Sequence, residues 1–278
     1  MCASYTGDGD QMLGHLNTRL NISKLHPVLF ERTKPLKLGD IVEVCGESGC
    51  GKTELLLHWT VQCILPDKWK ESELGGLNTG VLFIDNDYHF SILRLVSILE
   101  SQIRQKVTKN ESENISAGDL EKLMKSCLQR LYVERCQNTV EFLLSVEMLE
   151  TLLGNKPNIS VVMVDSISAF YWLDKDIGEA RLKHLTARLE KLVQDYQLIA
   201  FITNSLVSQH QNEGGTSAKT VMSDPVSRTW RKITTHKYFI SRNSASEFTI
   251  GLQGSHSDEQ TVLKFFISDA GIVYKSSQ

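Results

Sequence analysis

The chain has 278 residues, 41% of them hydrophobic and 23% charged, and this composition excludes a wholly disordered protein. Thirty basic residues against 33 acidic ones give a formal net charge of −3, which excludes a generic polycation that coats nucleic acid. The opening MCASYTGDGD is not a signal peptide, and no apolar run approaches the roughly 20 residues of a membrane span. We therefore expect a protein of the cytosol or nucleus with no membrane contact.

Strands and helices alternate along the first two thirds of the sequence. The segment 40–45 (DIVEVC) predicts a buried strand that runs into a glycine-rich turn, and 52–64 predicts a helix that stops before Pro66. Further apolar runs predict strands, and amphipathic patterns predict helices: strands at 81–85, 131–135, 159–165 and 198–203, and helices near 90–105, 119–129, 139–153 and 179–196. Runs such as VVMV lack polar alternation, as expected of strands that helices cover on both faces. The fold class is therefore α/β with a largely parallel sheet.

Polar stretches and a change of pattern mark the rest of the chain. The segment 106–118 is polar and aperiodic, which predicts a surface loop, and 205–228 predicts a second polar loop rich in Ser, Gln, Asn and Gly. Beyond it, alternating segments at 235–241, 247–252 and 262–268 predict a small antiparallel C-terminal extension.

The sequence GESGCGKT at 46–53 matches the complete P-loop pattern and lies between a predicted strand and a predicted helix. Glycines let successive backbone N–H groups point at phosphate oxygens, and the start of the helix adds a positive end. The lysine reaches the β- and γ-phosphates, and the threonine hydroxyl binds Mg²⁺. The sequence therefore predicts a site for ATP and Mg²⁺ made by Gly46, Glu47, Ser48, Gly49, Cys50, Gly51, Lys52 and Thr53.

A P-loop needs a second acid to hold its metal, and Asp165 ends the buried strand ISVVMVD. That position is the carboxyl edge of a parallel sheet, where nucleotides bind, although an Asp there also caps helices. We expect Asp165 and Thr53 to hold Mg²⁺. The spacing of 113 residues from Lys52 to Asp165, with further strands between, is typical of RecA-like ATPases. Small-molecule P-loop kinases usually have a shorter interval and an Arg-rich lid, which this sequence lacks.

Three stretches together resemble the eukaryotic RecA-like recombinase paralogues: GESGCGKTELLLHWTVQCILP at 46–66, VLFIDNDYHFSILRLVSILE at 81–100 and VVMVDSISAFYW at 161–172. The resemblance is dense over about 40–205. It implies an RecA-like P-loop ATPase core at 40–278, preceded by an N-terminal arm at 1–39. That arm is shorter than the family's usual helical DNA-binding domain, so a place at one end of an assembly is expected. It either binds a partner or docks on its own core.

The resemblance also implies a function and partners. It implies an ATP-binding subunit that acts in homologous-recombination repair of DNA double-strand breaks, in the nucleus, and assists the strand-exchange recombinase. The expected partners are recombinase paralogue D, with paralogues B and C, in a heteromeric complex that binds single-stranded or branched DNA. The alternative is a catalytically active DNA-dependent ATPase or strand-exchange motor.

Two departures from the family pattern bear on catalysis. Active members carry a glutamate as the catalytic base two residues beyond the Asp of the strand end, and here Asp87 matches that position with one methylene fewer. A reach shorter by about 1.5 Å is enough to misplace a general base, at a cost of about 100-fold. Asn204 matches the family, but Ser205 follows it where a glutamine usually senses the γ-phosphate. We therefore expect ATP binding with weak or absent hydrolysis.

The segment RTWRKITTHKYFISR at 228–242 is the best candidate for DNA contact, because it has no acidic residue and interleaves aromatic side chains. Its basic residues are Arg228, Arg231, Lys232, Lys237 and Arg242. The alternative is a strand whose aromatic side chains pack in the core. The six cysteines form no C-x-x-C pair, so we expect reduced thiols, and the histidines show no metal-ligand spacing.

Overall fold

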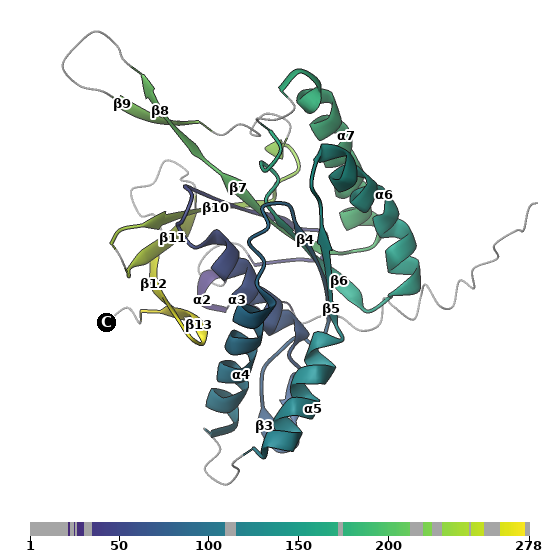
Figure 1. Cartoon of the computed structure of the whole chain (residues 1–278), viewed down its shortest axis with the longest axis vertical. Helices are drawn as coiled ribbons and strands as arrows, with labels where there is room; N and C mark the ends of the chain where they lie inside the picture. Colours follow the sequence, from purple (N-terminus) through teal and green to yellow (C-terminus); the bar gives the residue numbers. More distant parts are fainter. Residues whose placement is uncertain are drawn as a thin grey trace, which may run out of the picture.

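The computed structural model describes residues 22, 25, 27–30, 35–108, 115–171, 175–211, 219–223, 230–244, 246–252 and 262–275. A nine-stranded sheet forms its centre, in the order β13-β12-β11-β10-β1-β7-β6-β4-β5 (Figure 1). Six neighbouring strands run parallel: β1 (Ile41–Gly46), β4 (Gly80–Asp85), β5 (Leu131–Arg135), β6 (Ile159–Asp165), β7 (Ile199–Ser205) and β10 (His236–Arg242). The predicted α/β class with a largely parallel sheet is confirmed.

Helices cover both faces of this sheet, because alternate residues of each parallel strand point into two separate cores. Val42, Val44 and Phe83 belong to the first core, which α3 (Lys52–Ile64), α4 (Ile92–Thr108) and α5 (Ala117–Leu128) cover. Leu82 and Ile84 belong to the second, which α6 (Thr139–Asn155) and α7 (Lys175–Asp195) cover. Figure 1 shows α6 and α7 side by side on their face. No helix in the described ranges is long and apolar enough to cross a membrane.

The C-terminal strands form an antiparallel extension, as predicted, but it begins one strand later than expected. The strand β10 runs parallel to β1, and the antiparallel pairs are β10–β11, β11–β12 and β12–β13. The strands β11 (Phe248–Leu252) and β12 (Val262–Ser268) match the prediction, whereas β13 (Gly271–Tyr274) was not predicted. As a result, β10 extends the parallel sheet next to the P-loop strand, and its last residues reach the same edge as the P-loop.

Two predicted loops contain regular structure. The segment 205–228 was predicted to be a polar loop, but it holds an antiparallel hairpin of β8 (Val207–Gln211) and β9 (Lys219–Ser223). Figure 1 shows this hairpin projecting away from the body of the molecule beyond the end of β7. The predicted loop 106–118 is shorter than expected, because α4 continues to Thr108 and α5 begins at Ala117. A further small hairpin pairs β2 (Lys68–Trp69) with β3 (Ser72–Glu73).

The described part of the N-terminal arm packs on the protein's own core. The short helix α2 (Pro27–Phe30) places the Phe30 ring 6.0 Å from that of Trp59 and 5.9 Å from that of Tyr238, centroid to centroid. Leu25 is buried in the same core. This end of the arm therefore docks in cis, whereas the apolar residues Met12, Leu13, Leu16 and Leu20 lie outside the described residues.

Candidate nucleotide-binding site

Between β1 and α3, the P-loop has two glycines at which a side chain would clash or strain the backbone, Gly46 and Gly51. A Cβ atom on Gly46 would lie 2.4 Å from the Ile240 carbonyl oxygen of β10 and 2.6 Å from the Cys50 sulfur. Gly51, the residue before α3, has a φ of +93°, which L side chains rarely adopt. The glycines of the motif thus allow strand, loop and helix to meet within a very small space.

The amino end of α3 supplies the groups that phosphate chemistry requires. The first turn of a helix leaves its N–H groups without intrahelical acceptors, and these groups favour anions. Lys52 is 8% exposed, and its ammonium donates to the carbonyl oxygens of Gly46 and Glu47 at 3.0 and 2.8 Å. Glu47, Ser48 and Gly49 at the top of the loop are exposed. Lys52 therefore lies folded against the loop, beside an open face that a polyphosphate can reach.

The predicted metal ligands lie together although 112 residues separate them. The Thr53 hydroxyl donates to a carboxylate oxygen of Asp165 at 2.6 Å, and Thr203 of β7 donates to the other oxygen. Burial raises the pKa of Asp165, and the charge of Asp87 raises it further, while hydrogen bonds from Thr203 and Thr53 oppose the change. A hydroxyl and a buried carboxylate are oxygen ligands of the kind Mg²⁺ prefers, and a divalent cation would relieve the cost of burying this charge. The residues fit Mg²⁺.

The turn after β4 carries the position predicted for the catalytic base. The buried Asp85 carboxylate holds this turn in place, because it accepts hydrogen bonds from the backbone N–H groups of His89 and Phe90 and from the Arg135 guanidinium. Asp87 is half-buried, and its own N–H donates to the Asp165 carbonyl at 3.1 Å. The structure thus brings Asp87 to the metal-ligand strand, through an anchoring role of Asp85 that we did not predict.

A buried polar network behind the P-loop was also missed. Glu43 of β1 is fully buried, accepts from the Asn204 side chain at 2.8 Å and forms an ion pair with Lys237 of β10 at 3.1 Å. Next along β7, the Ser205 N–H donates to the Ser168 hydroxyl at 2.9 Å. A glutamate within the apolar run IVEVC was the one signal in the sequence, because a buried carboxylate requires partners.

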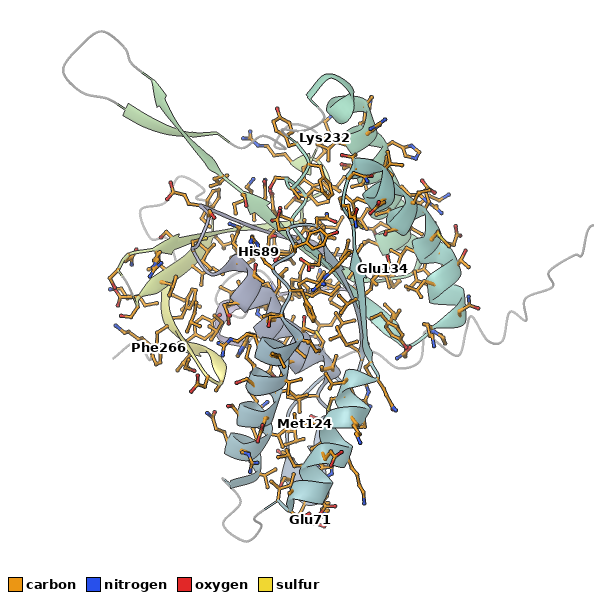
Figure 2. The ribbon with its side chains drawn as sticks, in the orientation of Figure 1. Glu71, His89, Met124, Glu134, Lys232 and Phe266 are labelled. Carbon is orange, nitrogen blue, oxygen red and sulfur yellow. The ribbon has the colours of Figure 1, made fainter. Side chains whose placement is uncertain are left out.

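Of the five basic residues proposed for DNA contact, the four that the structure describes are spread from the turn before β10 to the end of that strand. Arg231 and Lys232 are exposed and precede β10, whereas Arg242 ends that strand. Figure 2 shows Lys232 well apart from His89, which lies in the turn after β4. Lys237 is 13% exposed and pairs with Glu43, so a phosphate contact would compete with a buried ion pair. Arg228 lies outside the described residues.

Two of the three aromatic side chains of this segment are buried, whereas Phe239 is half-buried beneath the Lys237 ammonium, 5.7 Å from its ring centroid. Trp230 and Tyr238 have no exposed surface, and they belong to the second and first cores. For Trp230 and Tyr238 this arrangement matches the alternative interpretation of the segment, a strand with aromatic residues in the core. Among the described cysteines, Cys45, Cys50, Cys63, Cys127 and Cys136 are all buried.

The match to a known family agrees with this geometry. Residues 33–273 match the Rad51 family, which is more than half of the chain. The chain belongs to the Rad51 family. It is 32% identical over 295 aligned residues to the mouse DNA repair protein XRCC2, covering 99% of this chain and 100% of that protein. It is 27% identical over 263 residues to the XRCC2 homolog of Arabidopsis thaliana, covering 76% of this chain and 71% of that protein.

More distant relatives belong to the same group of proteins. The chain is 24% identical over 249 residues to the DNA repair protein RAD51 homolog 3 of Cricetulus griseus, covering 85% of this chain and 64% of that protein. The resemblance predicted from the three stretches is confirmed, and so is the RecA-like fold class. Membership of the Rad51 family argues against the alternative of a small-molecule P-loop kinase.

Proposed function

We propose that this chain is an ATP-binding recombinase paralogue that acts in homologous-recombination repair of DNA double-strand breaks, in the nucleus. The observation that carries the proposal is the meeting of Thr53 and Asp165 at 2.6 Å beside Lys52, on the carboxyl edge of a Rad51-family sheet. The similarity of this chain to XRCC2 proteins and to other DNA repair proteins of the family supports the proposed role in DNA repair.

The structure supports ATP binding more strongly than ATP hydrolysis. The residues proposed to hold phosphate and metal are present, whereas the position proposed for the base carries Asp87 and the position proposed for the γ-phosphate sensor carries Ser205. Asp87 is one methylene shorter than the usual glutamate, and Ser205 lacks the amide of the usual glutamine. Both changes remove contacts that matter mainly in the transition state, so we expect them to lower the rate of hydrolysis without a comparable loss of ATP affinity. We therefore favour an adaptor over a motor.

The adaptor works within a heteromeric complex. Its proposed partners are recombinase paralogue D, with paralogues B and C, and single-stranded or branched DNA bound through the complex. The net charge of −3 and the separation of the basic residues along 231–242 favour DNA binding through the assembly rather than by the isolated chain.

The test is Mg-ATP affinity and turnover of the purified full chain, alone and with paralogue D, for the wild type and Lys52→Ala. We expect the wild type to bind Mg-ATP with negligible turnover and Lys52→Ala to lose binding at least tenfold, because a buried cation at the phosphate site is removed. Lys70→Ala is the matched control, because Lys70 is exposed and pairs with Asp119 away from the P-loop. Rapid DNA-stimulated hydrolysis by the wild type would instead establish the motor.

A further inference from the structure

The turn 86–90, which carries the candidate base Asp87, is tied at its start to β6 and the proposed metal ligand Asp165. The N–H groups of Asn86 and Asp87 donate to the Asp165 carbonyl oxygen at 2.6 and 3.1 Å. The Asn86 side chain is buried, and its amide donates to the Ser166 carbonyl oxygen at 2.9 Å. These hydrogen bonds hold the first two residues of the turn against the end of β6.

The other end of the turn depends on the carboxylate of Asp85. This side chain has no exposed surface and accepts from the N–H groups of His89 and Phe90 at 3.0 and 3.3 Å, so one carboxylate closes the turn onto the end of β4. Between these points Tyr88 has a φ of +58°, in the left-handed region that non-glycine residues rarely adopt. Such a conformation persists only where the surrounding contacts enforce it. The turn therefore needs support from outside its own residues.

Arg135, the last residue of β5, supplies this support from the edge strand of the sheet. It lies opposite Asp85 in the parallel β4–β5 pair, and its Nε donates to the buried Asp85 carboxylate at 3.2 Å. Its Nη2 donates to the Phe90 carbonyl oxygen at 3.2 Å, and its guanidinium carbon is 5.8 Å from the centroid of the Tyr88 ring. One planar cation with several donors thus contacts the start, the tip and the end of the turn.

We propose that Arg135 is a positioning residue that sets where Asp87 stands relative to Asp165. The inference rests on the proposed nucleotide site and adds to it a residue of the edge strand β5. Arg135 acts through Asp85: it compensates the buried charge that closes the turn, and the closed turn holds Asp87 against β6. A lysine at this position would keep the charge, but a single ammonium cannot serve a carboxylate, a carbonyl oxygen and an aromatic ring together.

The first measurement is hydrogen exchange of the backbone amides in the full chain without nucleotide. We expect Arg135→Gln to speed exchange at His89 and Phe90 by about tenfold or more, because the carboxylate that binds both amides loses its compensating charge. Arg135→Lys should give an intermediate increase. Exchange along β7, in the middle of the sheet, should stay within about twofold, which separates local opening from global unfolding. The control is Arg104→Gln on α4, which removes an exposed guanidinium paired with Glu100 and should leave the turn unchanged.

The second measurement asks whether the position of the turn matters for chemistry. It uses the full chain with Asp87→Glu and Ser205→Gln, in which turnover is expected to be measurable. Adding Arg135→Gln should lower kcat about tenfold or more and change Mg-ATP affinity less than about twofold, because a base misplaced by about 1 Å loses turnover and not binding. A residue that served only the stability of the fold would lower the melting temperature without this selective loss of kcat.

Each other result overturns the assignment. Unchanged exchange at His89 and Phe90 in Arg135→Gln would show that Arg135 does not hold the turn, and full rescue by Arg135→Lys would show that charge alone suffices. An unaltered kcat would show that Asp87 does not depend on Arg135. No turnover in the chain with Asp87→Glu and Ser205→Gln would remove the base that Arg135 is proposed to position. Failure of the wild type to bind Mg-ATP would overturn the proposed nucleotide function instead, and the exchange measurement, which needs no nucleotide, tells these failures apart.

Discussion

The ion pair between Lys237 and Glu43 gives the most direct test of how the parallel sheet is held behind the P-loop. The substitution Lys237→Met keeps the length of the side chain and removes its charge, which leaves the fully buried Glu43 carboxylate with Asn204. Removing one partner of a buried pair typically costs about 3 kcal/mol or more, because the remaining charge lacks compensation. At about 2 °C per kcal/mol for a chain of this size, the melting temperature should fall by about 6 °C.

The assay is thermal unfolding of the full chain, with two further variants as controls. The double variant Glu43→Gln with Lys237→Met removes both charges and keeps an acceptor for Asn204, so we expect it to recover more than half of the loss. Lys264→Met removes an exposed lysine 4.0 Å from Glu247, and we expect a change below about 2 °C. A Lys237→Met variant that melts within 1 °C of the wild type, yet binds single-stranded DNA more weakly, would refute the reasoning and make Lys237 a DNA contact.

Two other predictions concern the proposed nucleotide site. Gly46→Ala should abolish Mg-ATP binding and lower the melting temperature, because its methyl group would lie 2.4 Å from the Ile240 carbonyl oxygen. The control is Gly118→Ala on α5, where the added Cβ has open space, and normal Mg-ATP binding by Gly46→Ala would contradict the packing argument. Asp87→Glu with Ser205→Gln should raise the steady-state ATPase rate by about tenfold or more with little change in Mg-ATP affinity, and no increase would show that these two positions do not limit turnover.

The strands at the middle of the central sheet could be predicted because they are apolar on both sides, and the prediction at 159–165 coincides with the observed bounds of β6. The predictions at 131–135 and 262–268 also coincide with the observed strands, although those strands have exposed residues. The direction of β10 could not be predicted in the same way, since its burial alternates between buried and half-buried residues, as in a one-sided antiparallel strand. Its parallel pairing depends on which strand lies beside it, and local pattern carries no such information. The hairpin β8–β9 was missed because its residues are polar and the segment contains glycines.

In the candidate site, too, the residues of a contiguous motif could be predicted, whereas those brought together by the order of the strands could not. A P-loop is a contiguous motif whose function depends on its own backbone, so the sequence alone identifies it. Asp165 could be predicted because a P-loop needs a second acidic residue to bind its metal, and this residue usually follows a buried strand. The network of Glu43 with Asn204 and Lys237 joins residues 161 and more positions apart, and only the order of the strands brings them together. The same holds for Arg242, which the sequence groups with Arg231 and the fold separates from it.

The helix α3 that follows the P-loop is held to the strands β12 and β13, and this arrangement suggests how the proposed ATP binding could matter without turnover. Arg94 of α4 makes a bidentate contact with Glu54 of α3 and also donates to the Ser268 carbonyl at 2.6 Å. The Ile272 N–H donates to Nδ1 of His58 on α3 at 3.2 Å. A ligand that binds only the folded state stabilises it by about 2.7 kcal/mol at 100 times its Kd. ATP bound at the start of α3, as proposed above, would therefore stabilise α3 and, through these contacts, β12 and β13. This stabilisation requires binding and not hydrolysis.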